Sequence, residues 1–218
     1  MTRFTIASFN VKNLIGPDQE YYEFQTYTPE EYAWKEDWLA DQLLSMDADI
    51  VCFQEIFEED ALQAVIEEAN ARATALNAAT IPDKSKRYHR KVIFRKLAVE
   101  TYASGTLAFA PNSADSGTPG QRRPGLAILS RFGFVGQPEV LQDLETPLDI
   151  PFQPLRGLEA GDAGYFRIRR LSRPVIKARI PIGDKIITVF NCHLKSKLGE
   201  FIRPKGAEFA PEENLTDY

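Results

Sequence analysis

Three polar residues suited to metal or phosphate chemistry each follow an apolar, strand-like run of the sequence. They are Asn10, Glu55 and His193. In α/β sheets, binding sites are built at the carboxyl ends of strands and in the loops that follow them. We therefore predict that these side chains, although far apart in sequence, lie together in space.

Glu55 is the residue of this group best suited to hold a metal ion. A carboxylate at the start of a loop is about as often simply solvated, but Glu55 directly follows the apolar run Asp49–Gln54. A hard cation such as Mg²⁺ (or Mn²⁺) takes oxygen ligands, and one protein carboxylate can suffice beside the phosphate oxygens of a substrate. We predict that Glu55 anchors such a cation.

His193 is one of only two histidines, and a lone histidine beside an apolar strand is by default a satisfied, partly buried side chain. Asn191 and Lys195 lie two residues to either side, so a continuing strand would bring all three residues to one face. Amide, imidazole and ammonium donors on one face suit an anionic oxygen. With a metal ion, such groups could position a phosphate ester for attack by water.

Alternating strands and helices are expected to position these residues in the first part of the chain. The run Phe4–Phe9 predicts a strand, and Thr28-Pro29-Glu30-Glu31 predicts the start of a helix that ends near Met46. Asp49–Gln54 is typical of a strand covered on both faces, and apolar spacing predicts a second helix over Glu58–Ala79. This order indicates an α/β (α+β) fold built in layers.

The remainder of the chain is expected to consist mainly of strands. We predict them at Tyr88–Phe94, Thr106–Ala110, Gly125–Ser130, Phe134–Leu141, Arg173–Ile182 and Lys185–Asn191. The last two would form a hairpin with Gly183-Asp184 at its turn. Pro111–Pro124 is predicted to be a loop, and Glu145–Gly164 an irregular insertion that breaks the strand periodicity.

Five stretches of the sequence together resemble the endonuclease/exonuclease/phosphatase superfamily. This superfamily includes pancreatic-type deoxyribonucleases, abasic-site repair endonucleases, bacterial sphingomyelinases and inositol polyphosphate phosphatases. The stretches, in the family's order, are Ala7–Leu14, Ala48–Glu55, Gly125–Arg131, Ser172–Val175 and Val189–Ser196. The resemblance covers nearly the whole chain except the insertions Tyr21–Thr28 and Glu145–Gly164. It implies part of a four-layer α/β/β/α sandwich, namely the first sheet and its helices.

The resemblance also implies roles for individual residues. Glu55 would bind the divalent metal ion, and Asn10 would contact metal or phosphate beside it. His193 would support the phosphate or the leaving group, and Arg173 would contact the phosphate. From the sequence alone, Arg173 is an equally good candidate for a surface arginine beside a strand.

Two further expectations concern the phosphate site. Asn191 and Lys195 are predicted to bind phosphate or substrate with the residues named above. Deoxyribonuclease-type relatives place an acidic residue near the Gly125–Arg131 strand, where this chain has Arg122-Arg123-Pro124. The mechanism is therefore not expected to copy that branch closely.

Two segments that the family carries later in its chains do not occur in this sequence. They are a Gly-Asp-Phe-Asn-like segment, which binds the nucleophilic water, and a Ser-Asp-His-like segment, which supplies the general base. We therefore expect residues 1–218 to form an incomplete domain that is inactive alone. A sheet face carrying residues of Ile50–Phe53 and Ile186–Phe190 would then be uncovered and lead to self-association.

Composition limits the classes of protein to consider. A net charge of -5 argues against a protein that coats nucleic acid non-specifically. No stretch approaches the ~20 apolar residues of a transmembrane segment, and no signal-peptide pattern is present, so we expect a cytoplasmic protein. Cys52 and Cys192 lie in apolar runs and are predicted to be buried free thiols.

Two basic groups favour nucleic acid as the substrate. They lie within Lys84–Lys96 and Arg167–Arg173, although a solvated, lysine-rich edge strand explains the first group equally well. We therefore expect metal-dependent phosphodiester cleavage in nucleic acid. The alternatives are a phosphatase or a phospholipid or sphingomyelin phosphodiesterase, acting on a small phosphate ester or a lipid head group, and a non-catalytic binding module on the same fold.

Overall fold

The structure is a computed structural model that describes residues 3–23, 25–78, 99–102, 106–151 and 165–194. The chain divides into two compact units, residues 1–140 with 173–193 and residues 141–172 with 194–218. The residues predicted to form the site lie in the first unit, except Lys195, which lies outside the described residues.

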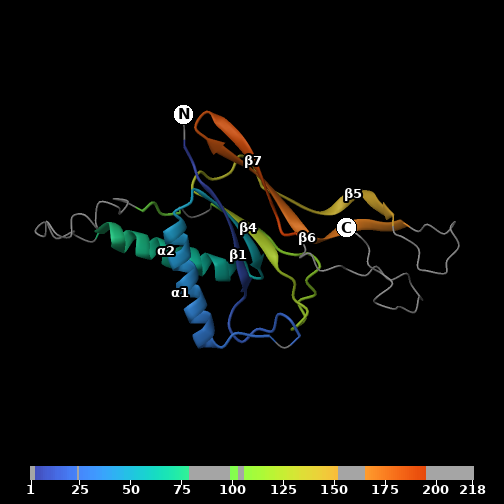
Figure 1. Ribbon diagram of the computed structural model, residues 1–218, viewed down its shortest axis with the longest axis horizontal. Helices are drawn as coiled ribbons and strands as arrows, with labels where there is room; N and C mark the ends of the chain where they lie inside the picture. The colour runs from blue at the N-terminus through green and yellow to red at the C-terminus, as the bar shows by residue number, and fades with distance from the viewer. Residues whose placement is uncertain (1–2, 24, 79–98, 103–105, 152–164, 195–218) are drawn as a thin grey trace, which may run out of the picture. The chain divides into compact units, whose positions relative to one another are not determined.

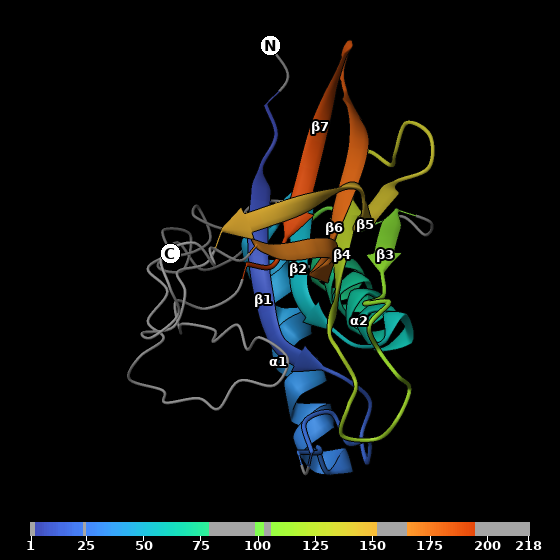
Figure 2. The ribbon, with the colours of Figure 1, turned by 90° about the vertical axis from the view of Figure 1, so that its right-hand side faces the viewer.

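A four-stranded sheet forms the centre of the first unit. Its strands, in spatial order, are β1 (Ile6–Leu14), β2 (Ile50–Ile56), β4 (Gly125–Ser130) and β3 (Leu107–Ala110). β1 and β2 are parallel, whereas β4 runs antiparallel to both of its neighbours. Figure 2 shows the four strands side by side. All residues of β4 and all but Glu55 of β2 are buried, as expected for strands covered on both faces.

The helices α1 (Pro29–Met46) and α2 (Glu59–Ala78) cover one face of this sheet (Figure 1). α1 begins at the predicted capping box, in which the Thr28 hydroxyl accepts from the Glu31 N–H at 3.2 Å and the Glu31 carboxylate accepts from the Thr28 N–H at 2.9 Å. The core on this side joins apolar side chains of both helices to Val51 and Phe53 of β2. Both predicted helices are therefore confirmed to within a residue of their expected ends.

The opposite face of the sheet packs against a hairpin formed by β6 (Tyr165–Ile182) and β7 (Lys185–Cys192). Ile176, Ala178 and Ile180 of β6 are fully buried in one cluster with Ile50 and Cys52 of β2. Among the described residues, two sheets and two helices confirm the mixed α/β class. In the first unit, the two helices, the four-stranded sheet and the paired part of the β6–β7 hairpin form three layers.

Two expectations about this region need correction. We expected the Ile50–Phe53 and Ile186–Phe190 strands to share one uncovered sheet face, but β7 pairs with β6 in a second sheet that covers β2. The exposed apolar side chains are instead on the outer side of β7, where Ile186 is 49% and Phe190 58% exposed. Cys52 is a buried free thiol as predicted, whereas Cys192 points outward and is exposed. Self-association stays a prediction, although the face that we expected to mediate it is covered.

β5 (Glu139–Pro151) is an edge strand of the second sheet, whose order is β5-β6-β7. It begins later than the predicted strand Phe134–Leu141 and extends into the predicted insertion Glu145–Gly164. The prolines there misled the prediction because edge strands tolerate them, since one side of the strand needs no ladder hydrogen bonds.

Residues 152–164 and the strand and basic group predicted within residues 84–96 lie outside the described residues. In the second unit, Arg167 is paired with Asp149 at 2.7 Å.

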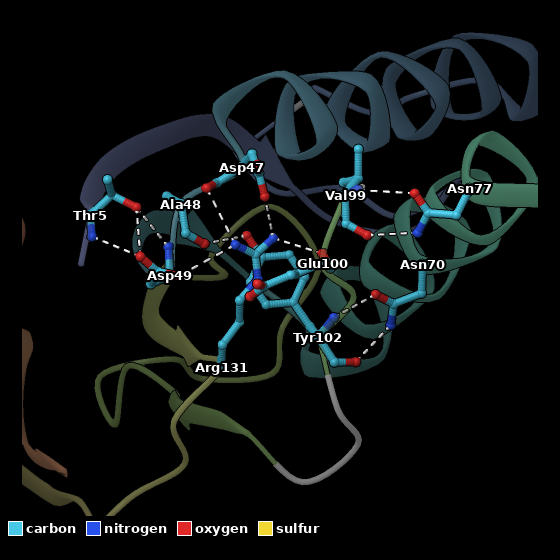
Figure 3. A network of polar contacts seen from close by, with 10 residues as sticks. All are labelled: Thr5, Asp47, Ala48, Asp49, Asn70, Asn77, Val99, Glu100, Tyr102 and Arg131. Atoms are coloured by element: carbon cyan, nitrogen blue, oxygen red, sulfur yellow. Dashed lines mark hydrogen bonds and ion pairs between the residues drawn. The ribbon is translucent and has the colours of Figure 1, made fainter. Parts of the chain in front are cut away.

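A polar network around Arg131 joins the end of β4 to the loop between α1 and β2 (Figure 3). The Arg131 guanidinium donates to Asp47 Oδ1 at 2.8 Å and to the Glu100 carbonyl at 2.7 Å, and lies 3.5 Å from Asp49 Oδ1. Its guanidinium carbon Cζ also lies over the Tyr102 ring, 4.6 Å from the ring centroid. Its side chain is only 6% exposed, so these partners, and not water, surround the guanidinium.

Replacing Arg131 with Met should destabilise the protein by about 3 kcal/mol, because it leaves buried acceptors and carboxylates without their cation. Urea unfolding of Arg131→Met against the wild type measures this difference. Arg179→Met is the matched control, since Arg179 is an exposed arginine on β6. Equal losses in the two variants would show that the network does not hold β4 in place.

Candidate active site

The site lies where two neighbouring strands lose their regular pairing. The β1–β2 register shifts between Asn10 and Leu14, and the β2–β4 register shifts between Gln54 and Ile56. Lys12 and Glu55 have φ angles of 55° and 67°, a left-handed region that non-glycine residues seldom adopt. Bulges of this kind redirect side chains and are frequent next to active sites. The bulge in β2 gives Glu55 the one partly exposed side chain of an otherwise buried strand.

Glu55 is in contact with both of its predicted companions. Its Oε1 accepts a hydrogen bond from Asn10 Nδ2 at 2.9 Å and lies 3.5 Å from His193 Nε2. Asn10 is itself held by the Lys12 N–H, which donates to its Oδ1 at 2.8 Å. In the part of the chain that the structure describes, Glu55 Oε2 has no hydrogen-bond partner. The carboxylate is thus positioned by one oxygen, while the other is available to a ligand.

The β6–β7 hairpin brings Arg173 and His193 to the same place. Val175 pairs with Cys192 at the open end of the hairpin, and Arg173 Nη1 donates to the His193 carbonyl at 3.2 Å. Burial and then the Arg173 charge lower the pKa of His193, while Glu55 acts in the opposite direction. His193 is therefore held in its neutral form at pH 7, in which one ring nitrogen donates and the other accepts.

Asn191 lies beneath the site rather than on its surface. It is buried, and its Nδ2 donates to the carbonyls of Phe53 at 2.8 Å and Ala127 at 2.9 Å. Its Oδ1 accepts from Gln54 Nε2 at 2.9 Å. With both amide hydrogens in use, Asn191 ties β7 to β2 and β4 next to Glu55. The strand ends at Cys192, so the shared face predicted for Asn191, His193 and Lys195 is not continued as a strand.

Tyr22 and Arg123 were not predicted as site residues. Burial raises the pKa of Tyr22, and so does Glu55, while Arg173 and Arg123 lower it. All three charges are thus near the phenol. Tyr22 packs edge-on against Phe57, with ring centroids 6.0 Å apart, and it comes from the segment that the family motifs leave out as an insertion. The sequence features that could have pointed to these two residues are the tyrosines of this insertion and the adjacent arginines Arg122 and Arg123.

Arg122 and its neighbour Arg123 have different roles. Arg122 donates to Glu58 Oε1 at 2.9 Å and to Gln19 Oε1, and the other Glu58 oxygen accepts from the Gly16 N–H. Arg122 therefore braces the loop that follows β1. Arg123 is the member of the pair whose charge reaches Tyr22.

Comparison with known proteins adds two similar structures. No protein-family model and no curated protein matches this chain. An endonuclease/exonuclease/phosphatase family protein from Leptotrichia buccalis C-1013-b is 14% identical over 88% of this chain and 54% of its own, with a TM-score of 0.43. An endonuclease/exonuclease/phosphatase from Beutenbergia cavernae DSM 12333 is 16% identical over 91% of this chain and 40% of its own, with a TM-score of 0.43. Both carry the name of the family that the five motifs resemble. This chain thus spans about half the length of the solved chains that it matches.

The donor atoms at Glu55 fit a hard cation better than a closed metal cage. No cluster of three His, Cys, Asp or Glu side chains occurs among the described residues, whereas a closed structural zinc site needs four protein ligands. Glu55 supplies one carboxylate oxygen, while Asn10 contacts that carboxylate through its amide nitrogen and holds its own oxygen against the Lys12 N–H. Mg²⁺ commonly keeps several waters and binds one or two carboxylates with phosphate oxygens.

In the described ranges, no helix is long and apolar enough to cross a membrane.

The charges around His193 predict how its pKa responds to substitution. Arg173→Gln should raise the pKa of His193, because it removes a cation that disfavours the imidazolium, and Glu55→Gln should lower it further. An NMR titration of the histidine ring protons measures both shifts, and a His89→Gln variant identifies the His193 signal. Shifts of the same sign in both variants would show that these two charges do not act on His193 as the geometry indicates.

Proposed function

We propose that this chain carries the metal and phosphate-binding part of a hydrolase that cleaves phosphodiesters in nucleic acid with Mg²⁺ or Mn²⁺. The observation that carries the proposal is the convergence of Asn10 from β1, Glu55 from β2, Arg173 from β6 and His193 from the end of β7. The likeness of the motifs to the endonuclease/exonuclease/phosphatase superfamily supports the same reaction class.

Each residue of this group has a part in positioning the substrate. The cation, held by Glu55 and Asn10, would neutralise charge on the phosphate oxygens. Arg173 would donate to a second phosphate oxygen, a partner that suits a guanidinium. Neutral His193 would donate a ring N–H to the phosphate or to the leaving oxygen. The Tyr22 hydroxyl would supply another donor, and burial raises its pKa further above its ordinary value, so the proton is retained.

Preorganised donors of this kind account for most of the catalysis in phosphoryl transfer. Groups fixed before the reaction need not reorganise as charge moves, and removing one donor typically costs about 10²- to 10³-fold in rate. Asn10 and Glu55 fix each other, and Arg173 fixes the backbone at His193. These contacts support the proposal, because they hold the donors in place before a substrate binds.

The proposal is tested by assaying the protein, as its gene encodes it, on labelled DNA and RNA, a phosphomonoester and sphingomyelin vesicles. We expect cleavage of nucleic acid in Mg²⁺ and none in excess chelator. Equal nucleic acid cleavage in chelator would refute metal dependence. Turnover of only the monoester or only the vesicles would refute nucleic acid as the substrate.

A further inference from the structure

A groove of about 800 Å³ lies beside the site, between the start of α1 and the bulged end of β1. Trp34 and Trp38 line it from α1, and Asn10, Lys12, Tyr27 and Lys35 line it as well. The two tryptophans are four residues apart, so they lie on one face of the helix. They are 71% and 43% exposed, and they are the only tryptophans of the chain.

The groove is continuous with the candidate active site through Asn10. This residue lines the groove and also donates to Glu55 at 2.9 Å. Phe9, the residue before it, contacts Trp38 with ring centroids 6.1 Å apart. A group attached to a phosphate held at Glu55 would therefore meet the tryptophans next.

The floor of the groove is polar and fixed. Lys35 is buried, lies 4.6 Å from the centre of the Tyr27 ring, and donates to Tyr27 Oη at 2.7 Å and to the Lys12 carbonyl. Tyr27 Oη donates to the same carbonyl at 3.2 Å. The Lys12 carbonyl is satisfied by these two donors, and the Lys35 ammonium has used two of its three N–H groups. The polar edge of a flat ring can accept from the third N–H, whereas an acyl chain cannot. This chemistry favours a base over a lipid tail.

We propose that this groove binds a nucleobase of a nucleic acid strand, stacked on Trp34 and Trp38, while the adjoining phosphate lies at Asn10 and Glu55. The inference deepens the proposed function and rests on it. Stacking on aromatic side chains is tolerant of sequence, because every base has a π-face. The groove would therefore increase affinity for single-stranded or unpaired nucleotides without selecting one base.

The two tryptophans report directly on the groove, because no other tryptophan contributes to the fluorescence of the chain. The probes are a single-stranded DNA oligomer and a matched oligomer of abasic nucleotides that keeps every phosphate. We expect the first to quench tryptophan fluorescence and to bind residues 1–218 more tightly than the second. Trp34→Ala should weaken binding of the base-containing oligomer on the order of 10-fold and leave the abasic oligomer unaffected.

Three controls make the result decisive. Trp34→Phe should retain most of the affinity because it keeps an aromatic face, and Leu76→Ala, which removes an exposed apolar side chain on α2, should change nothing. Circular dichroism verifies that each variant is folded. Equal affinity of the wild type for both oligomers, equal weakening of both by Trp34→Ala, or a tryptophan-dependent preference for sphingomyelin vesicles would overturn the proposal.

Adding Mg²⁺ separates this inference from the proposed function. Mg²⁺ should tighten binding of both oligomers through the phosphate, and Glu55→Gln should abolish that gain while leaving the difference between the oligomers. A base preference without any Mg²⁺ effect would refute the metal site and retain the groove. A Mg²⁺ effect without any base preference would refute the groove alone.

Discussion

Glu55→Gln is expected to lower metal-dependent hydrolysis by about 100-fold or more, because it removes the carboxylate that we propose neutralises the divalent cation. Glutamine has the same size and can still hydrogen-bond to Asn10, so the fold should be retained. The bulge at Glu55 also belongs to the backbone of β2, and this substitution keeps that backbone intact. The loss should therefore appear in turnover and not in stability.

The measurement is the initial rate of nucleic acid cleavage by the gene-encoded protein at saturating Mg²⁺, with thermal unfolding as the check on folding. Glu59→Gln is the matched control because Glu59 is an exposed carboxylate four residues further on, at the start of α2. Rates that fall equally in both variants, or in neither, would remove Glu55 from the site.

Asn191→Asp is expected to destabilise the fold by about 4 kcal/mol, the largest stability effect that we predict. The substitution barely changes side-chain size. It turns an amide that donates to two buried carbonyls, those of Phe53 and Ala127, into an acceptor that faces them. The carboxyl group must then be either charged and buried or protonated with one carbonyl left unpaired, and both are costly.

Chemical denaturation at pH 7 measures this difference, and Gln121→Glu, an exposed amide-to-carboxylate change, is the control. The loss should shrink as the pH falls, because the introduced carboxyl group becomes protonated and can then donate a hydrogen bond to one of the two carbonyls. A pH-independent loss below about 1 kcal/mol would mean that Asn191 does not tie the two sheets together.

The sequence predicted the elements that carry strong local signals. The capping box at Thr28 predicted α1, because capping hydrogen bonds join residues that are close in sequence. The apolar run after Asp49 predicted β2, because a strand buried on both faces is apolar at consecutive positions. Strands beside prolines were less predictable. Whether proline is tolerated depends on the edge position of β5, which is a property of the sheet and not of the segment.

The candidate site was predicted in part for the same reason. The apolar runs before Asn10, Glu55 and His193 predicted that these residues come together, although β1 and β2 extend past Asn10 and Glu55 and only His193 follows its strand. The bulge that turns Glu55 outward depends on pairing with both neighbours, and the burial of Asn191 depends on where the second sheet packs. Tyr22 reaches the site through a loop whose path is set by tertiary contacts with Phe57.

Binding of Mn²⁺ to residues 1–218, followed by electron paramagnetic resonance, tests the metal site most directly because it requires no turnover. We predict that the wild type and Glu59→Gln bind a single Mn²⁺ ion that excess Mg²⁺ displaces, that Asn10→Ala binds it more weakly, and that Glu55→Gln does not bind it. Unchanged Mn²⁺ binding in a folded Glu55→Gln variant would contradict a metal site at Glu55.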